Sequence, residues 1–254
     1  MRSIILILLA TVLPAGAAVA SGGGAHLDHA AVDIGNRSSL QRGAKYFFNY
    51  CVSCHSANFS RYNRIATDLG LSDLQVEDNF IFTDSTIRDH MTVAMRPKDA
   101  KEWFGTAPPD LTLSARAKGA DWLYTYLRSF YLDDTRPFGV NNLVLENAAM
   151  PHVLWELQGL QKRAHKEAEA HADGGHGDEQ EHGGGAPVLE LVRPGTMSPD
   201  QYDRAVLDLV NFMVYLSEPA QVVRKQIGVW VLSFLLLLFV VTYLLKKEYW
   251  KDIH

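Results

Sequence analysis

The sequence predicts a mainly α-helical domain that is held outside the cytoplasm by a single C-terminal transmembrane helix. Apolar residues recur at helical spacing in several segments, no segment shows convincing strand alternation, and uniformly apolar stretches stand near both ends of the chain. The chain has 254 residues, 47% of them hydrophobic, which is enough for one large domain or two small ones. Its formal net charge of −5 is too small to indicate a partner, and no nucleic-acid partner is expected.

The N-terminus has the pattern of a secretory signal peptide. Arg2 provides the basic start, and residues 4–13 form an apolar stretch that is too short to span a bilayer well. Ala18-Val19-Ala20 is a small-residue cleavage site. We therefore expect residues 1–20 to be removed and the folded domain, residues 21–225, to lie in a bacterial periplasm or an equivalent space.

The second apolar stretch, residues 226–245, has the length and the flanks of a membrane-spanning helix. Ile227 to Leu245 carries no charge and, at about 1.5 Å per residue, reaches about 28 Å, close to the hydrocarbon thickness of a bilayer. Basic residues flank both ends and an aromatic residue stands near each end, namely Arg224, Lys225, Lys246, Lys247, Lys251, Trp230 and Tyr243. The flanking charges orient the helix weakly, whereas the signal peptide places the domain outside and residues 246–254 in the cytoplasm.

The first helix of the domain is predicted to start at Ser38. Gln41 follows three residues later, which is the capping-box pattern. An apolar stripe at helical spacing runs from there to Cys51. Gly43 lies on this stripe, where it would let another helix cross closely.

The middle of the chain alternates between loops and helices. Residues 56–80 are mixed and rich in turns, and a short helix is expected over 85–95. Prolines and a glycine predict a loop at 98–112, and helical spacing predicts a strong helix over 114–132. Another loop is expected at 133–145.

A low-complexity insert and one further helix complete the domain. Residues 165–186 are rich in His, Gly and acidic side chains, and the composition favours a solvated linker over a weak metal-binding segment. The last helix of the domain is predicted to start at Ser198, with Pro199 at its first position and Gln201 closing a capping box. Pro219 marks a break before the membrane helix.

The two cysteines of the chain stand in the pattern Cys51-Val-Ser-Cys54-His55, which is typical of covalent haem c attachment. Each thiol can add to one vinyl group of the haem, and His55 then lies under the iron as the proximal ligand. A redox dithiol and half a zinc site are the alternatives. A zinc site would require more ligands than two cysteines supply, and a dithiol would require a βαβ context. We therefore expect one covalently bound haem c.

The residue spacing leaves the sixth iron ligand open between several candidates. Met150 follows a long loop and precedes a proline, which favours an extended backbone that could approach the iron. Met95 is one alternative ligand, and His152, two residues after Met150, is another. The remaining candidates are expected to serve packing or to lie at the surface: Met91, Met197, Met213 and His90.

Four motifs follow one another along the chain. They are Cys51-Val-Ser-Cys-His55, Ala107-Pro-Pro-Asp-Leu111, Arg116-Ala-Lys-Gly-Ala-Asp-Trp-Leu-Tyr-Thr-Tyr-Leu127 and Met150-Pro-His-Val-Leu-Trp-Glu-Leu-Gln-Gly159. Together with one C-terminal membrane helix, this set resembles the cytochrome c1 family, the haem c subunit of the bacterial cytochrome bc1 complex (quinol–cytochrome c oxidoreductase). The resemblance covers nearly the whole mature chain, and the insert at 165–186 matches none of its motifs.

The resemblance implies a cytochrome c-like haem domain and assigns its site residues. Met150 becomes the sixth iron ligand, opposite His55. Pro109 and Trp122 are implied to line the haem pocket, and Arg116 is implied to face a haem propionate.

The resemblance also implies a function and a set of partners. The haem would accept one electron from the Rieske iron–sulfur protein and pass it to a c-type cytochrome, within a dimeric complex that includes cytochrome b in the bacterial inner membrane. A Met/His pair leaves no open iron position, which suits electron transfer, and no quinol site is expected in this chain. The alternative is a membrane-tethered haem c enzyme with an open sixth position. The acidic insert is also a candidate attractor for a basic acceptor cytochrome, against a solvated insert without a partner.

Overall fold

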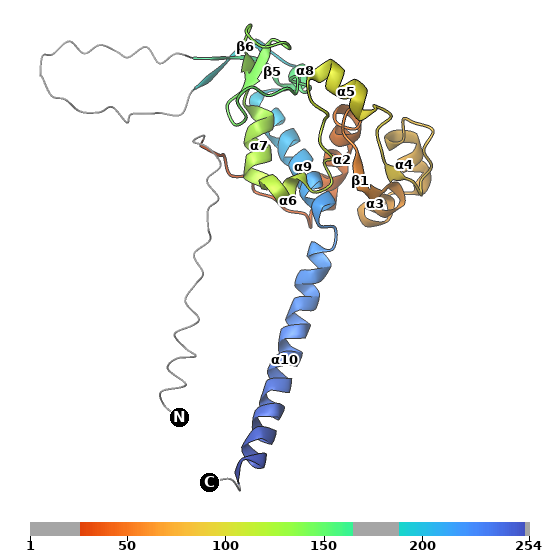
Figure 1. Cartoon of the computed structure of the whole chain (residues 1–254), viewed down its shortest axis with the longest axis vertical. Helices are drawn as coiled ribbons and strands as arrows, with labels where there is room; N and C mark the ends of the chain where they lie inside the picture. The colour runs from red at the N-terminus through yellow and green to blue at the C-terminus, as the bar shows by residue number, and fades with distance from the viewer. Residues whose placement is uncertain (1–25, 165–187, 252–254) are drawn as a thin grey trace, which may run out of the picture.

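The computed structural model describes residues 26–164 and 188–251, so the predicted signal peptide and the His/Gly-rich insert lie outside the described residues. The described part is mainly α-helical, which confirms the predicted fold class (Figure 1). Its helices are α2 (Arg37–Tyr50), α3 (Tyr62–Leu69), α4 (Asp73–Phe80), α5 (Pro97–Phe104), α6 (Ser114–Lys118), α7 (Ala120–Arg128), α8 (Trp155–Gln158), α9 (Pro199–Ser217) and α10 (Gln221–Tyr249). Its strands are β1 (Ala57–Arg61), β2 (His90–Met91), β3 (Phe130–Leu132), β4 (Val140–Asn142), β5 (Gly159–Arg163) and β6 (Leu189–Pro194).

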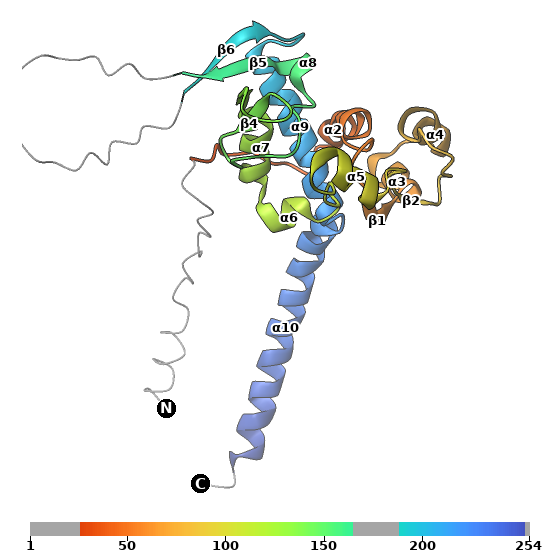
Figure 2. The same cartoon turned by 45° about the horizontal axis from the view of Figure 1, so that its top comes forward.

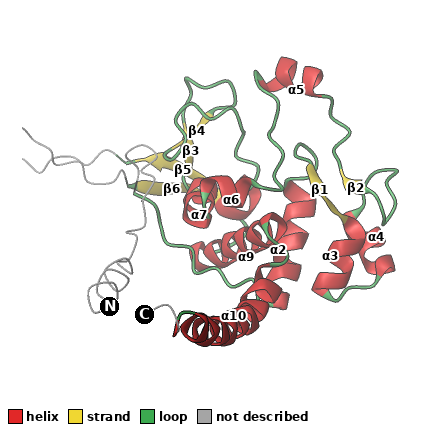
Figure 3. Ribbon diagram, turned by 60° about the horizontal axis from the view of Figure 1, so that its bottom comes forward, coloured by secondary structure: helices red, strands yellow, loops and turns green. Residues whose placement is uncertain are grey.

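Helices α2 and α9 cross at the centre of the domain, with α6 and α7 packed against α9 (Figures 2 and 3). A side chain at Gly43 would place its Cβ 2.0 Å from the carbonyl oxygen of Asp208 and 2.8 Å from the Cβ of Phe212. Because no real side chain tolerates such contacts, the helices can approach this closely only at glycine. The predicted close crossing at Gly43 is confirmed.

A buried carboxylate locks the crossing. The Asp208 side chain accepts hydrogen bonds from Ser39 Oγ at 2.6 Å and from Arg42 Nε and Nη2 at 2.6 and 2.9 Å. Asn211 Nδ2 in turn donates to Ser39 Oγ at 2.7 Å. A buried charge is stable only when it is paired and hydrogen-bonded, so this network fixes how α2 sits on α9. It thereby fixes where the C-terminal end of α2 delivers Cys51.

The start of α9 and the break after it are as predicted. Ser198 Oγ accepts the N–H of Gln201 at 3.4 Å, and the Gln201 side chain accepts the N–H of Ser198 at 2.9 Å, which completes the capping box. Pro199 occupies the first helical position. Helix α9 ends before Pro219 and α10 begins after it, so the predicted break is confirmed.

The cap of α2 differs from the prediction. Asn36 Oδ1 accepts the N–H of Ser39 at 3.1 Å, so asparagine rather than Ser38 caps the helix. Asparagine is at least as good an N-cap as serine, and it comes earlier in the chain. Gln41 instead donates from Nε2 to the carbonyl of Leu69 at 2.8 Å, which joins α2 to α3.

Several predictions for the middle of the chain are wrong. Residues 85–95 form turns and β2 instead of a helix, because β2 pairs with β1. The helix predicted over 114–132 is interrupted at Gly119, whose φ of 91° lies in the left-handed region, and its last residues belong to β3. The loop predicted at 98–112 contains most of α5. The absence of strands was also wrongly predicted, since β1–β2, β3–β4 and β5–β6 form three two-stranded antiparallel pairs.

The β5–β6 hairpin stands at the end of the domain away from α10 (Figures 1 and 2). The N–H of Ala164 donates to the carbonyl of Val188 at 2.9 Å, so the insert leaves and rejoins the described chain at one point. Gly159 begins β5 with a φ of 95°, and a Cβ there would lie 2.1 Å from the carbonyl oxygen of Arg193. Glycine is therefore required at this corner, which holds the hairpin against the domain.

Arg128 at the end of α7 joins the N-terminal arm to α9. Its Nη1 donates to Asp28 at 2.6 Å, and its Nε and Nη2 donate to the two carboxylate oxygens of Asp203 at 2.6 and 3.0 Å. The guanidinium also lies 4.4 Å from the ring centroid of Tyr124, within cation–π range. One side chain thus ties three segments together while only 23% of it is exposed.

Replacing Arg128 by alanine should lower the free energy of unfolding by about 2 kcal/mol, because charge-assisted hydrogen bonds of half-buried groups contribute about that much. Urea unfolding of the purified full-length haem protein in detergent measures the effect. Arg96→Ala is the matched control: the Arg96 side chain, just before α5, pairs within the described residues with Asp99 of that helix alone and is 80% exposed, so its removal should cost less than about 1 kcal/mol. Equal effects of the two changes would show that Arg128 is not a structural junction.

Helix α10 extends from the domain alone (Figure 1). From Ile227 onward its large apolar side chains are exposed instead of packed on the domain, and Trp230 is 78% exposed. Among the described residues, this is the helix that is long and apolar enough to cross a membrane. Exposing so large an apolar area to water is unfavourable, so the helix belongs in a bilayer.

Candidate haem site

An apolar cavity of about 290 Å³ opens between α2, α7, α9 and the loops before α6 and α8. Its lining includes six of the seven residues predicted for the haem site: Cys51, Cys54, His55, Pro109, Trp122 and Met150. These residues come from four separate stretches of the chain, and the fold brings them to one place. The volume is close to the lower end of the roughly 300–1,000 Å³ that is typical for ligand sites.

The end of α2 presents both thiols to this cavity. Cys51 closes the helix, with its N–H donating to the carbonyl of Phe47 at 2.9 Å. The chain then turns back, because the N–H groups of Cys54 and His55 both donate to the carbonyl of Cys51, at 3.1 and 2.9 Å. Burial raises the pKa of the Cys51 thiol to about 12. A redox dithiol requires a lowered thiol pKa, so this environment disfavours the dithiol interpretation.

The imidazole of His55 is held in the orientation that a metal ligand needs. Its Nδ1 donates to the carbonyl of Pro109 at 2.7 Å, which leaves the Nε2 lone pair free. Burial lowers the pKa of His55, against the opposing effect of that hydrogen bond. The ring is therefore neutral at neutral pH, and a neutral imidazole is the form that binds a metal.

Backbone contacts hold the Pro109 carbonyl in place. Asp110 accepts the N–H of Asn58 at 2.7 Å, and the N–H of Leu111 donates to the carbonyl of Ser56 at 2.9 Å. The stretch after His55 is thus paired with the loop before α6. Asp110 was not among the predicted site residues, although it stands inside the Pro-Pro-Asp-Leu motif.

Met150 reaches the cavity from a loop that Asn142 shapes. Asn142 Oδ1 accepts the N–H groups of Val144 and Leu145, and its Nδ2 donates to the carbonyl of Tyr126 at 2.8 Å. The Met150 Sδ accepts a hydrogen bond from the hydroxyl of Tyr126 at 3.5 Å. Burial raises the pKa of Tyr126 to about 12, so the hydroxyl keeps its hydrogen at physiological pH.

The other ligand candidates lie outside this cavity, with one exception. Met91 is fully buried in β2, His90 is exposed, and Met95 does not line the cavity. His152 is buried and stacked on Phe130 at 5.0 Å, where burial lowers its pKa to about 4. Met213 of α9 is the exception, since it lines the cavity from the α9 side.

The structure does not place Arg116 in the lining of the cavity. Arg116 is exposed on α6, and Lys118 lines the cavity instead. The ammonium of Lys118 lies 5.2 Å from the centroid of the Trp122 ring. Lys118 and Tyr126 were not among the predicted site residues. Tyr126 lies one helical turn after Trp122 on α7, so its place on the cavity side of that helix could have been found from the spacing. Lys118 precedes the break at Gly119, so helical spacing does not place it.

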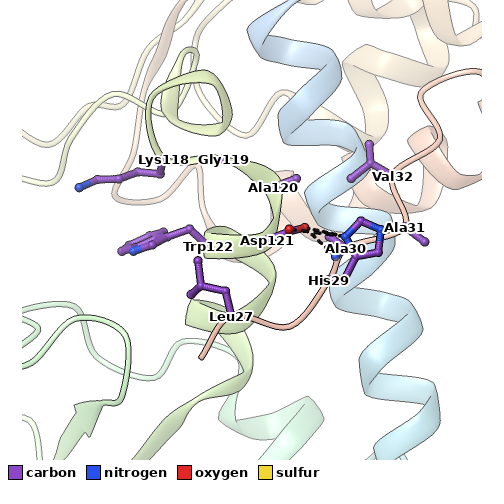
Figure 4. Close-up of a pocket in the computed structure, with 10 residues that line it drawn as sticks. All are labelled: Leu27, His29, Ala30, Ala31, Val32, Lys118, Gly119, Ala120, Asp121 and Trp122. Carbon is purple, nitrogen blue, oxygen red and sulfur yellow. Dashed lines mark hydrogen bonds and ion pairs between the residues drawn. The ribbon is translucent and has the colours of Figure 1, made fainter. Parts of the chain in front are cut away.

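A second, more open hollow of about 690 Å³ lies under the N-terminal arm, and Lys118 and Trp122 line it as well (Figure 4). The arm is tied to α7 there, because Asp121 accepts the N–H of Ala30 at 2.8 Å and faces His29 at 3.5 Å. Lys118 and Trp122 therefore form the wall between this hollow and the candidate haem cavity.

Two thiols, a neutral imidazole and a thioether around an apolar cavity fit a haem whose vinyl groups react with the thiols. On a mainly helical domain with a membrane helix, they define a membrane-anchored c-type cytochrome. The chain belongs to the cytochrome c1 family, whose model matches residues 30–160 and 190–253. The two ranges are separated by residues 161–189, which include the His/Gly-rich insert that matches none of the family motifs.

Two relatives match this chain over the full length of both proteins. It is 49% identical to cytochrome c1 of Allochromatium vinosum, with 100% of both chains covered. It is 47% identical, again over 100% of both chains, to a protein of Nitrosomonas europaea described as the ammonia monooxygenase gamma subunit. Cytochrome c1 of Rhodospirillum rubrum is 25% identical over 86% of this chain and 83% of that protein. These findings confirm the resemblance and the membrane-anchored haem protein.

Proposed function

We propose that this chain accepts one electron from a Rieske iron–sulfur protein and passes it to a c-type cytochrome, as the haem c subunit of a bc1-type complex. The carrying observation is the convergence of Cys51, Cys54, His55 and Met150 on one apolar cavity. When bound there, the haem supplies a one-electron Fe(III)/Fe(II) couple. The residues around it hold the group, exclude water and set its potential.

The residues divide these roles among themselves. Cys51 and Cys54 would form the two thioethers, and His55 and Met150 would bind the iron. Pro109 orients His55 through its carbonyl, at 2.7 Å from Nδ1. Trp122 is the apolar wall on the α7 side.

Arg116 remains the residue proposed to face a propionate. Its side chain would have to turn from the exposed face of α6 to do so. Lys118, whose ammonium lies 5.2 Å from the Trp122 ring centroid and which already lines the cavity, is a second cation that could take that role. Paired alanine variants distinguish them, since only the residue that meets the propionate should change the haem potential.

The proposed partners follow from the same assignment. Cytochrome b and the Rieske subunit would be the permanent neighbours in a dimeric complex, and a soluble or membrane-bound c-type cytochrome would be the acceptor. The haem domain would face the periplasm, with residues 246–254 in the cytoplasm of a bacterium. The chain would be an electron carrier, and the quinol site would lie in another subunit.

The rival function is a haem subunit of an enzyme with an open iron position. The Nitrosomonas europaea relative favours testing it, because that protein is described as a subunit of a monooxygenase. The two functions differ at the iron. A Met/His pair closes both axial positions, whereas an enzyme requires one open or labile position. The purified full-length protein should bind neither carbon monoxide nor cyanide readily, and fast binding of either would favour the rival.

Electron transfer itself can be followed in membranes that contain the assembled complex. Added quinol should reduce the haem c band only when the Rieske subunit is present, and an oxidised c-type cytochrome should then reoxidise it. Membranes that lack the Rieske subunit are the control. Equal reduction in both membranes would contradict the proposed donor.

The anchor gives a further expected result. A chain that stops after Val223 should be released as a soluble periplasmic haem protein, because it lacks nearly all of α10, the proposed bilayer span. Fractionation of cells that lack the other subunits measures this. The full-length chain in the same cells is the control and should stay with the membranes. If the shortened chain also stays, a second membrane contact exists.

A further inference from the structure

Tyr126 touches the proposed sixth ligand directly. Its hydroxyl donates to the Met150 sulfur at 3.5 Å, and only 7% of the residue is exposed. Within the described ranges, 26–164 and 188–251, the hydroxyl makes no other side-chain hydrogen bond. The hydrogen bond is therefore shielded from water, which would otherwise compete for both groups.

The ring of Tyr126 has little freedom to move away from this sulfur. Trp122, one turn earlier on α7, stacks on it with ring centroids 4.8 Å apart and planes 11° apart. Phe130 meets it edge-on at 5.1 Å. The Tyr126 carbonyl also accepts from Asn142, which shapes the loop of Met150. Donor and acceptor are thus held by one set of contacts.

We propose that Tyr126 is a positioning residue that raises the reduction potential of the haem by donating a hydrogen bond to the sulfur of Met150. The inference rests on the proposed function, since it requires Met150 to be an iron ligand. It adds Tyr126, which is not one of the proposed iron ligands, to the residues that set the reduction potential.

The geometry of a thioether makes the arrangement possible. The sulfur of methionine has two lone pairs, one of which can bind the iron while the other accepts the hydrogen of Tyr126. The hydroxyl therefore does not compete with the iron. It instead limits rotation of the Met150 side chain, so the free lone pair keeps one direction.

The sign of the effect follows from electrostatics. A hydrogen bond draws electron density from the sulfur, which weakens it as a donor, and the ferric iron depends more on that donation than the ferrous iron. The positive end of the O–H dipole points at the Met150 sulfur, so with an iron bound to that sulfur it would disfavour the more positive ferric state. Both contributions stabilise the reduced form, and hydrogen bonds to ligating sulfur are known regulators of metal potentials.

Tyr126→Phe tests the inference while keeping the ring between Trp122 and Phe130. In redox titrations of the full-length haem protein, the midpoint potential should shift to a lower value and the sulfur-to-iron charge-transfer band should change in position. Tyr124→Phe is the matched control: Tyr124 is on the same helix, only part-buried, with its ring against Arg128. It should leave both readouts unchanged. No shift with Tyr126→Phe, or an equal shift with Tyr124→Phe, would overturn the inference.

A double-mutant cycle with Met150→Leu separates this inference from the proposed function. If Tyr126 acts through the sulfur, Tyr126→Phe should have no further effect once Met150 is leucine. An undiminished shift in that background would mean that the hydroxyl acts on the haem by itself and would overturn the inference. If Met150→Leu leaves the charge-transfer band intact, both the proposed ligation and this inference fail. If Met150→Leu abolishes the band but Tyr126→Phe changes nothing in the protein that keeps Met150, only the inference fails.

Discussion

Replacing Met150 by leucine should lower the midpoint potential of the haem strongly while the haem stays covalently attached. The thioethers depend on Cys51 and Cys54, which the change does not touch. Leucine has nearly the volume of methionine, so the cavity wall is kept, but it cannot bind iron. Because axial ligands set haem potentials over a range of about 0.8 V, we expect a fall on the order of 0.1 V or more.

Three measurements check this result. A redox titration gives the potential, the visible spectrum shows whether the sulfur-to-iron charge-transfer band is lost, and a pyridine haemochrome assay shows that the haem remains. In the assembled complex, the Rieske centre should stay reduced, because the haem is then too poor an acceptor.

Met213→Leu is the matched control, since Met213 is the other thioether in the cavity wall. It should leave the band and the potential close to those of the parent. If Met213→Leu abolishes the band and Met150→Leu does not, the ligand comes from α9 and the assignment of Met150 is wrong.

The sequence could predict those parts of the site that local chemistry dictates. The spacing of Cys51, Cys54 and His55 follows from the shape of one haem edge, so five residues suffice to propose it. Met150 could be ranked by its loop and its proline but not chosen by them. The family motifs, and not the spacing, raised it above Met95 and His152.

The residues that sequence reasoning missed act across the fold. Tyr126 contacts Met150 because the Met150 loop packs on α7. No local sequence pattern predicts a contact between residues that far apart in the chain. The same holds for the strands: β1 and β2 are short and pair across two intervening helices. The α9 cap at Ser198 was predicted because a capping box is complete within four residues.

Gly43 connects the fold to the site. It stands on α2 two turns before Cys51, at a point where the backbone of α9 leaves no room for a side chain. Across this crossing, Met213 and Leu209 of α9 line the cavity whose thiols come from α2. The position of the thiols relative to the α9 wall therefore depends on how closely the two helices approach.

Replacing Gly43 by alanine should lower the free energy of unfolding by about 3 kcal/mol, because a Cβ 2.0 Å from the carbonyl oxygen of Asp208 must push the helices apart. The gain in helix propensity, about 1 kcal/mol, offsets only part of that cost. For a domain of this size the midpoint of thermal unfolding should fall by roughly 6–12 °C. Gly43→Val should cost more.

Gly228→Ala is the matched control for this change. Gly228 is also inside a helix, but a Cβ there meets nothing within 4 Å, so the change should be neutral or slightly stabilising. Thermal unfolding of the full-length haem protein in detergent, followed by the haem absorbance and by circular dichroism, compares the two. Because the crossing also positions the thiols, Gly43→Ala should reduce the fraction of chains that carry haem. A Gly43→Ala protein with the parent's unfolding temperature and haem content would show that α2 and α9 can separate without cost, and the crossing would then not control the site.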